Sequence, residues 1–542
     1  MSSDSVRTEF SVPIGPQTTG SPLRLRAERA LDLALHRIPP DPNTDHVRHV
    51  LEQARRALHM PMRIAVAGVV SSGKSTLVNA LVGGELMVTG LNPVTFTVSV
   101  LRYADEQAVT VHFRDGRPSE HHPMTSLARF TARTPDGRGC VDAAWVDVHG
   151  PFPYLRWFDL VDTPGFGSQF EADALAALTA LGLTAEGVSA ATAAQLSRAD
   201  AVLAVLNAGV SRSDADLLAR FRGNDLTLSP VTCVGVITKV ELAWLGEAGR
   251  PVGDPLVAAR KTAERIIANP DMSRLFHDVH PVCSKVAAAA AGMGDEEYAD
   301  LVSLARTDRR LLEKRLRVHR AFATSPYGDL PLPPERRAPL VRRFSPYGIF
   351  LATALIREGV DKPDDLRAEL DRRSGMAALR QALVRHFGRR RDLIKLGRIL
   401  DSVHAVDVDG PDVCGNDPRT RAAVRDALRQ ITDLERDELA FVELRTLRRW
   451  YEGEIALSEA EAAELRTAMG ERGASVAERL GLPPVTVLAE MERTALERLG
   501  HWRTSPLANQ PGGRALAQVM ERRYEQLCHR VRTARALLEE QE

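Results

Sequence analysis

The sequence predicts an α/β protein: a P-loop nucleotide-binding domain with a mostly parallel sheet, joined to an α-helical bundle. Three observations lead to this fold class. A short apolar strand, a glycine loop and a helix follow one another at residues 62–81. Apolar strands then alternate with helical segments to about residue 285. Beyond about residue 403, the apolar residues recur only at helical spacing.

Five segments follow from these patterns. Residues 1–21 are rich in Ser, Thr, Pro and Gly and are expected to form a disordered N-terminus. Residues 22–60 are expected to form a helical hairpin (the neck), and residues 61–290 the P-loop domain. Residues 291–402 are expected to extend that domain and add a helical segment, and residues 403–542 to form a helical trunk or stalk.

The predicted strands are short apolar runs between turn or helix signals. Within the predicted strand 201–207, residues 202–206 are an unbroken apolar run, as expected of a strand that is covered on both faces of a sheet. In chain order the predicted strands are 62–67, 97–103, 108–113, 143–148, 156–161, 201–207, 232–238 and 278–283.

Composition excludes several classes of protein. The chain of 542 residues has 44% hydrophobic and 26% charged residues, which is ordinary for a globular protein. Its formal net charge is zero, so no global field favours nucleic acid. The five cysteines form no Cys-x-x-Cys pair, so neither a zinc site nor a disulfide framework is indicated, and a reducing cytoplasm is favoured. No apolar run approaches the ~20 residues of a membrane-spanning helix, so any membrane contact would be peripheral.

The strongest motif is the glycine loop after the first strand, which fits G-x-x-x-x-G-K-[ST]. Backbone N–H groups of such a loop and the following helix end hold a polyphosphate. Lys74 would reach the β- and γ-phosphates, and Ser75 would ligate Mg²⁺. The predicted phosphate-binding residues are Gly68, Ser71, Ser72, Gly73, Lys74, Ser75 and Thr76.

Two segments that follow the glycine loop in the sequence could contact the γ-phosphate and Mg²⁺. Asn92-Pro93-Val94-Thr95 precedes the second predicted strand, and Thr95 could fold over Mg²⁺ and the γ-phosphate, with Thr97 as a rival. Asp162-Thr163-Pro164-Gly165 ends an apolar strand. Asp162 would hold the water shell of Mg²⁺, and the amide of Gly165 would sense the γ-phosphate.

Two further segments suit a guanine base. Thr238-Lys239-Val240-Glu241 follows an apolar strand and approaches the guanine-reading pattern [Asn/Thr]-Lys-x-Asp. The carboxylate would accept two hydrogen bonds from guanine, a donor pair that adenine lacks, while the stem of Lys239 lies along the base. Glu241 stands where Asp is usual, so weaker selectivity and a P-loop ATPase stay open. Ser284 and Lys285 follow the last strand and could offer backbone amides to the guanine oxygen.

The order of these motifs resembles GTPases, and the detail resembles the dynamin superfamily, in particular bacterial dynamin-like proteins. The resemblance lies in residues 90–103, 143–165 and 200–207, which are similar to that family's first switch and strands. Residues 345–350 and 374–379, with Phe387, are similar to actinobacterial isoniazid-inducible dynamin-like proteins.

The resemblance implies Mg²⁺-dependent GTP hydrolysis, stimulated when two G domains form a homodimer across their nucleotides. It implies that helical segments transmit this meeting to lipid at the inner face of the cell membrane. No nucleic-acid partner is expected, because the formal net charge is zero. Ser71 stands where the family places a residue that helps hold a charge-compensating cation, and Thr95 would position the attacking water. Val70 stands where eukaryotic dynamins have a water-orienting Gln. A second hypothesis is therefore a GTP-switched helical scaffold that binds protein partners with little turnover.

Two surface segments complete the expectations. Residues 325–346 contain many prolines and predict an exposed loop, whose basic cluster (Arg336, Arg337, Arg342, Arg343) is expected to be a solvated face rather than a binding patch. Residues 481–488, Gly-Leu-Pro-Pro-Val-Thr-Val-Leu, are the one candidate for a membrane-contacting tip. The favoured expectation for them is an ordinary bundle turn with buried apolar residues.

Overall fold

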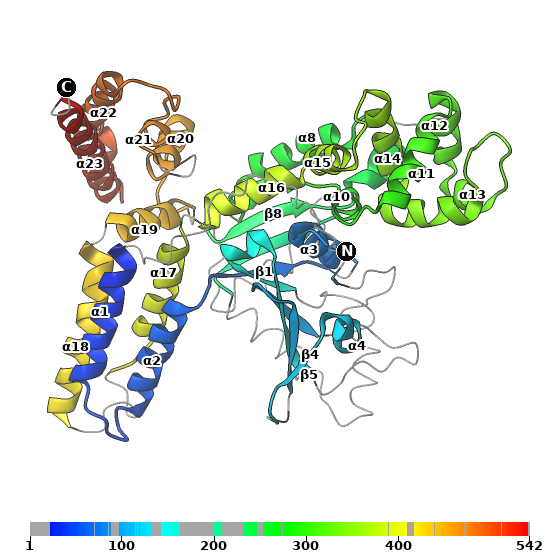
Figure 1. The fold of residues 1–542 in the computed structure, drawn as a ribbon. Coiled ribbons are helices and arrows are strands. Elements are labelled where there is room, and N and C mark those ends of the chain that lie inside the picture. The colour runs from blue at the N-terminus through cyan, green and yellow to red at the C-terminus, as the bar shows by residue number, and fades with distance from the viewer. Residues whose placement is uncertain are drawn as a thin grey trace. The chain divides into compact units, whose positions relative to one another are not determined.

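A computed structural model of the chain shows two compact units, which are described separately (Figure 1). One unit spans Pro61–Gly388, and the other combines Thr18–Met60 with Arg389–Glu542. The structure describes residues 22–69, 71–84, 86–87, 97–113, 115, 117–131, 143–162, 199–207, 231–246, 253–273, 275–388, 390–408, 417–437, 439–451, 453–470, 473, 475–510 and 512–539. The predicted disordered segment 1–21 lies outside these residues.

The first unit contains a nine-stranded sheet in the order β4-β3-β5-β2-β6-β1-β7-β8-β9. Five of its eight strand pairs are parallel, and β2–β6, β3–β4 and β3–β5 are antiparallel, so the predicted mostly parallel sheet is confirmed. The strands are β1 (Arg63–Ala67), β2 (Val98–Tyr103), β3 (Ala108–Phe113), β4 (Glu120–His122), β5 (Ala143–Gly150), β6 (Asp159–Asp162), β7 (Ala201–Leu206), β8 (Cys233–Ile237) and β9 (Val279–Pro281).

The eight predicted strands all occur, and their ends shift by up to three residues. The structure adds β4, whose sequence Glu-His-His carries no apolar alternation and which pairs only with β3 at the edge of the sheet. β1 lies near the centre of the sheet, paired with β6 on one side and β7 on the other. Its Ile64, Ala65, Val66 and Ala67 are buried, because both faces of a parallel sheet are covered.

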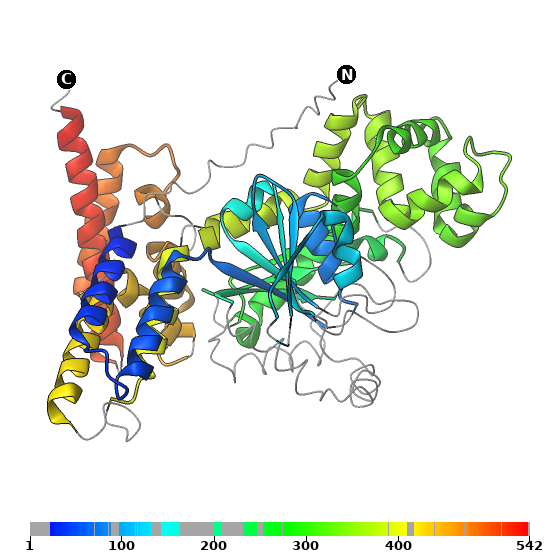
Figure 2. The ribbon, with the colours of Figure 1, turned by 60° about the horizontal axis from the view of Figure 1, so that its bottom comes forward.

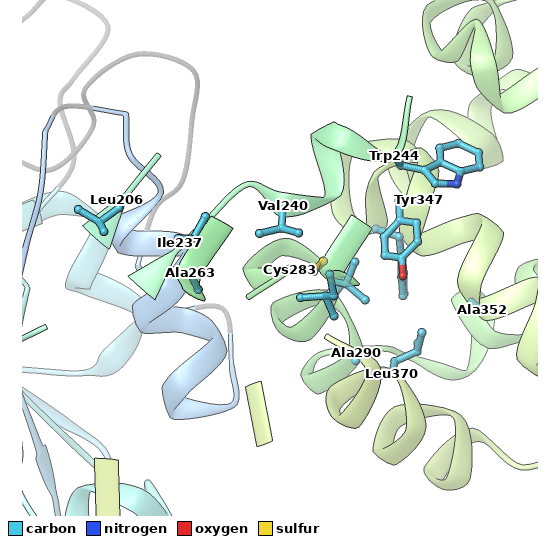
Figure 3. Close-up of a cluster of buried hydrophobic side chains, with 14 of the residues drawn as sticks. Leu206, Ile237, Val240, Trp244, Ala263, Cys283, Ala290, Tyr347, Ala352 and Leu370 are labelled. Carbon is cyan, nitrogen blue, oxygen red and sulfur yellow. The ribbon is translucent and has the colours of Figure 1, made fainter. Parts of the chain in front are cut away.

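The core of this unit runs from the sheet into the helices that follow it. Leu206 and Ile237 end two neighbouring strands, and Trp244, Cys283 and Tyr347 continue the same buried cluster through the helices (Figure 3). The helices and turns of this unit are α3 (Lys74–Val82), η1 (Met124–Ser126), α4 (Leu127–Thr131), η2 (Pro153–Arg156), η3 (Val240–Trp244), α8 (Pro255–Ala268), α9 (Pro270–Ser273), α10 (Ser284–Ala291), α11 (Asp295–Ala305), α12 (Arg309–Arg317), α13 (His319–Thr324), α14 (Pro334–Arg357), α15 (Pro363–Arg373), α16 (Met376–Leu383) and the π-helix η4 (Val384–Gly388).

Helices α11 to α14 form a lobe that extends beyond the sheet in both views (Figures 1 and 2). The lobe corrects the prediction of an exposed loop at 325–346, because α14 covers residues from Pro334 onward. Pro334 occupies the first helical position, where a missing N–H costs nothing. At Ser345 the backbone takes φ 63° and breaks the helix, so Pro346 begins a second helical run.

The basic cluster of this segment is only in part the solvated face that the sequence predicted, because Arg336 and Arg342 are exposed whereas Arg337 is buried. Arg336 forms two hydrogen bonds of 2.9 Å with Asp300 on α11. Arg337 is fully buried and donates to the backbone carbonyls of Phe322 and Ser325. These arginines therefore hold the lobe together, because their partners lie on α11 and α13 or just after it.

The second unit is a set of helices with two apolar clusters. α1 and α2 pack on α17 and α18, and their buried residues form one cluster with those helices. The second cluster joins α19 to α23. The elements are α1 (Pro22–Arg37), α2 (Asp45–His59), α17 (Arg391–His404), α18 (Pro418–Asp437), α19 (Leu439–Tyr451), α20 (Glu459–Ala468), α21 (Val476–Arg479), α22 (Leu488–Arg503), η5 (Pro506–Asn509) and α23 (Gly513–Glu539).

The division between the units falls at Gly388 rather than at residue 402, because α17 packs on α2 in the second unit. Lys395 of α17 donates to the carbonyls of Ala57 and Met60 at the end of α2. The helical bundle predicted from the apolar stripes is present. Among the described helices, none has the length and apolarity needed to cross a bilayer.

Candidate functional site

The loop between β1 and α3 has the backbone geometry of a phosphate-binding loop. Ser71 and Gly73 take positive φ values of 59° and 94°, and Gly73 directly precedes α3. At Gly68 a Cβ atom would lie 2.7 Å from the carbonyl oxygen of Val205 on β7. Only glycine fits there, because the loop folds closely over the end of the neighbouring strand.

Lys74 is the first residue of α3 and its side chain bends back over the loop. Its Nζ donates to the carbonyl oxygens of Gly68 and Val69, at 3.0 Å each. The residue is only 7% exposed, and burial lowers the pKa of the ammonium group to about 8, although Asp162 opposes that shift. A buried cation at the start of a helix is well placed to meet a phosphate.

Asp162 ends β6 and faces the same helix start. It is fully buried, and Ser75 Oγ donates to its Oδ2 at 3.2 Å. Burial raises the pKa of this carboxyl to about 6, against the opposing effects of Lys74 and Ser75. Among the described residues, Asp162 Oδ1 has no hydrogen-bond partner. A hydroxyl and a carboxylate with a free oxygen are the hard donors that Mg²⁺ prefers, so these residues fit the ion.

The predicted base-reading loop is tied to the phosphate loop by a hydrogen bond. Thr238, just after β8, donates from Oγ1 to the carbonyl oxygen of Ser72 at 2.5 Å. Lys239 then takes a left-handed backbone conformation with φ 58° and starts the turn η3. The two loops lie side by side because β8 and β1 both neighbour β7.

Glu241 lies in η3 and is largely buried. Burial raises the pKa of its carboxyl, while a backbone hydrogen bond, Lys285 and Lys239 lower it. In the described part of the chain, its Oε2 accepts no hydrogen bond. A buried carboxylate oxygen that still lacks a donor is suited to accept one from a ligand. The extra methylene of glutamate has therefore not turned this side chain out into solvent.

Ser284 and Lys285 begin α10, directly after β9 and Cys283. Ser284 is buried, and Lys285 is close enough to Glu241 for each charge to shift the pKa of the other. Burial nevertheless lowers the pKa of Lys285 overall. The structure thus brings the start of α10 to the base-reading loop, as the motif order predicts.

Three of the highlighted residues lie outside the residues that the structure describes: Val70, Thr95 and Gly165. The rival Thr97 is described and lies buried just before β2. One polar residue was missed by the sequence reasoning. Asn207 directly follows β7, between the ends of β1 and β8, and its buried Oδ1 has no partner within the described ranges. Its position after an unbroken apolar strand was the available signal.

A buried ion pair between Arg380 and Asp371 contacts α3 near its C-terminal end. Arg380 of α16 donates to both carboxylate oxygens of Asp371, at 2.7 and 2.9 Å, and also to the carbonyl oxygen of Ala80 on α3. Its guanidinium lies 4.9 Å from the ring centroid of Tyr154. The helix that starts at Lys74 is therefore anchored to α15 and α16.

The fold and the loop geometry define a P-loop protein whose site is arranged as in GTPases. Comparison with known proteins identifies the family. Residues 64–240 match the model of the dynamin family. The isoniazid-induced protein IniC of Mycobacterium tuberculosis is 32% identical over 457 residues, which is 84% of this chain and 86% of that protein. The chain belongs to the dynamin family of GTPases, and within it to the bacterial dynamin-like proteins.

Other bacterial relatives match shorter parts. A bacterial dynamin-like protein of Nostoc punctiforme is 47% identical over 113 residues, covering 19% of this chain and 16% of that protein. Dynamin-like protein 2 of Campylobacter jejuni is 34% identical over 140 residues, covering 25% and 22%. A solved structure titled as an oligomerised bacterial dynamin pair that senses and tethers membranes aligns with 95% of this chain and 92% of its own, at 13% identity and a TM-score of 0.30.

Proposed function

We propose that this protein hydrolyses GTP with Mg²⁺ and that its G domains self-associate to do so. The observation that carries the proposal is the convergence of Lys74, Ser75 and Asp162 beside the loop that holds Glu241. The proposed G domain is residues 61–290, with residues 22–60 as neck and residues 291–388 as extension. α17 joins residues 403–542 in the proposed trunk.

The residues of this chain would act mainly by positioning. Lys74 would exchange its two carbonyl acceptors for phosphate oxygens and so neutralise charge on the β- and γ-phosphates. Ser75 and Asp162 would hold Mg²⁺, which supplies further charge stabilisation at the phosphates. Glu241 would select guanine by its free carboxylate oxygen, and Thr238 would keep the two loops in register. Ser71 and Thr95 would have the roles that the resemblance implies, and the amide of Gly165 would sense the γ-phosphate.

Turnover per molecule is expected to rise with protein concentration, because the proposed enzyme is completed by a second G domain. The measurement is phosphate release from GTP with Mg²⁺ over a protein series of roughly a hundredfold, where a dimer-dependent enzyme gains about tenfold or more in specific rate. A flat and very slow specific rate, together with intact GTP binding, would instead support the helical scaffold. Val70 is the sequence feature that favours that second function, because valine cannot orient a water molecule.

The helical unit carries an exposed apolar end that suits membrane contact. Val485 and Val487 are 90% and 65% exposed, so the expected bundle turn with buried apolar residues is wrong. Glu492 near the start of α22 pairs with Arg532 and Arg535 near the end of α23, so these helices run antiparallel. The exposed Leu537 and Leu538 therefore lie at the same end of the hairpin as the two valines. We name Val485, Val487, Leu537 and Leu538 the apolar tip.

Replacing Val485 and Val487 with aspartate is expected to lower the affinity of the protein for vesicles, measured by co-sedimentation, by about 30-fold or more. Losing the burial of two valine side chains costs about 2–3 kcal/mol, and aspartate adds a desolvation penalty. The matched control is Leu25→Asp with Leu33→Asp, two exposed leucines on α1 of the same unit. Equal losses in both double variants would contradict a membrane role for the apolar tip.

A further inference from the structure

The outer helices of the lobe carry a second surface, which we name the α12–α13 basic surface and define as Arg310, Lys314, Val318 and Arg320. All four side chains are exposed, and Val318 is 60% exposed. Within the described residues, the three cations form no ion pair or side-chain hydrogen bond. The whole chain has 71 basic and 71 acidic residues, so this local excess of positive charge is specific to the segment and does not follow from the composition of the chain.

The carboxylates near this surface are already engaged by other groups. Asp308 caps α12 by accepting the backbone N–H of Leu311 at 2.9 Å. Glu313 pairs with Arg317 at 2.6 Å, and Asp329 pairs with Arg315. No further acidic residue occurs between positions 306 and 320. The positive charge of the basic surface is therefore left for an external partner.

The helix geometry turns the two cations of α12 to one side, and the exposed Arg320 follows on α13. Leu312 and Leu316 of α12 are fully buried one turn apart and fix its inner face. Arg310 and Lys314 are also one turn apart and lie away from that inner face at 3.6 residues per turn. Val318 is the C-cap residue of α12, where the backbone angles are no longer helical, and its side chain is exposed. Figures 1 and 2 both show α12 and α13 in the part of the lobe that extends beyond the sheet.

We propose that the α12–α13 basic surface binds the anionic headgroups of a bilayer, with Val318 entering the interface between them. Cations around an exposed apolar side chain match a charged surface with an apolar layer beneath. Nucleic acid fits less well, because residues 306–320 contain no Phe, Tyr or Trp on which a base could stack, and His319 is their one aromatic ring. The proposal rests on the peripheral membrane role proposed above and adds a contact on the G-domain unit, separate from the apolar tip.

The test is co-sedimentation of the full chain with vesicles of phosphatidylcholine, with and without phosphatidylglycerol. Arg310→Gln with Lys314→Gln is expected to weaken binding to the anionic vesicles by about 20- to 30-fold, since each interfacial cation contributes about fivefold. The matched control is Arg260→Gln with Lys261→Gln on α8, which removes the same charges from another exposed helix of the same unit. Val318→Asp should weaken binding further, and raising salt should reduce the wild-type binding.

The outcomes separate this proposal from the proposed function. The proposal is supported if the α12 variant binds anionic vesicles more weakly, while its GTP binding is unchanged and the α8 variant binds these vesicles as well as wild type does. Equal binding of the α12 and α8 variants, with binding still lost in the Val485 and Val487 variant, overturns the inference and leaves the membrane role intact. Wild-type protein that binds neither vesicle overturns the membrane role itself, whereas GTP turnover is measured independently. Tighter binding of duplex DNA than of anionic vesicles at the same salt overturns the choice of lipid.

Discussion

Replacing Lys74 with alanine is expected to weaken the binding of GTP by about 100-fold or more, and that of GDP, which lacks the γ-phosphate, by about 10-fold or more. Charge-assisted hydrogen bonds contribute about 1.5–3 kcal/mol each, and Lys74 would make one to the β- and one to the γ-phosphate of GTP. In the structure its ammonium group is already buried over the loop, so no rearrangement of the helix is needed for that contact. Titration calorimetry with Mg²⁺ measures the change directly.

Two comparisons make this measurement specific to the proposed site. Lys261→Ala removes an exposed lysine of α8 and should leave nucleotide affinity unchanged. Ser75→Ala should remove only the part of GTP affinity that depends on Mg²⁺, because Ser75 is proposed to ligate the metal while Lys74 contacts the phosphates. Displacement of labelled GTP by GDP but not by ATP would support guanine selectivity through Glu241. Tight GTP binding by the Lys74 variant would sink the proposed site.

The sequence predicted the sheet and the phosphate loop because both are encoded locally. A glycine loop between an apolar strand and a helix can fold in few ways, and Gly68 and Gly73 are fixed by a close approach and a positive φ. The turn that carries Thr238 and Glu241 was also predictable, since it follows an apolar strand, and its role in reading the base stays a prediction. Strand β4 was missed because edge pairing, not apolar alternation, holds Glu120–His122 in the sheet.

The features that were wrong or missed depend on contacts between distant residues. The composition of the basic cluster near Arg336 predicts solvent exposure. Arg336 is exposed, although it pairs with Asp300 of α11, but Arg337 is buried and donates to backbone carbonyls. Val485 and Val487 of the apolar tip were expected to be buried because valine is apolar. They are exposed instead, in a turn that follows Pro483 and Pro484. Neither the burial of Arg337 nor the exposure of the two valines can be derived from sequence periodicity, because both depend on how segments far apart in the chain pack.

Breaking the buried ion pair between Arg380 and Asp371, which contacts α3, is expected to lower the stability of the G-domain unit strongly. Arg380 and Asp371 are about 5% and 8% exposed in their side chains, and Arg380 also donates to the backbone of α3. Removing one partner of a buried pair costs about 3–5 kcal/mol, because the other charge is left without compensation. Arg380→Ala is therefore expected to lower the melting temperature of the G-domain unit by on the order of 10 °C. Thermal denaturation followed by circular dichroism measures it.

The same variant tests whether α16 holds the phosphate loop in place. The control is Arg372→Ala, which removes an exposed arginine that pairs with Glu369 three residues earlier on the same helix α15, and such surface pairs contribute about 0–1 kcal/mol. The double change Arg380→Met with Asp371→Leu removes both buried charges and should recover most of the stability lost in Arg380→Ala. If the stable double variant still binds GTP more weakly than wild type, the hydrogen bond from Arg380 to Ala80 positions α3 for the nucleotide. Unchanged affinity would restrict the pair to a role in folding, because α3 would then keep Lys74 in place without it.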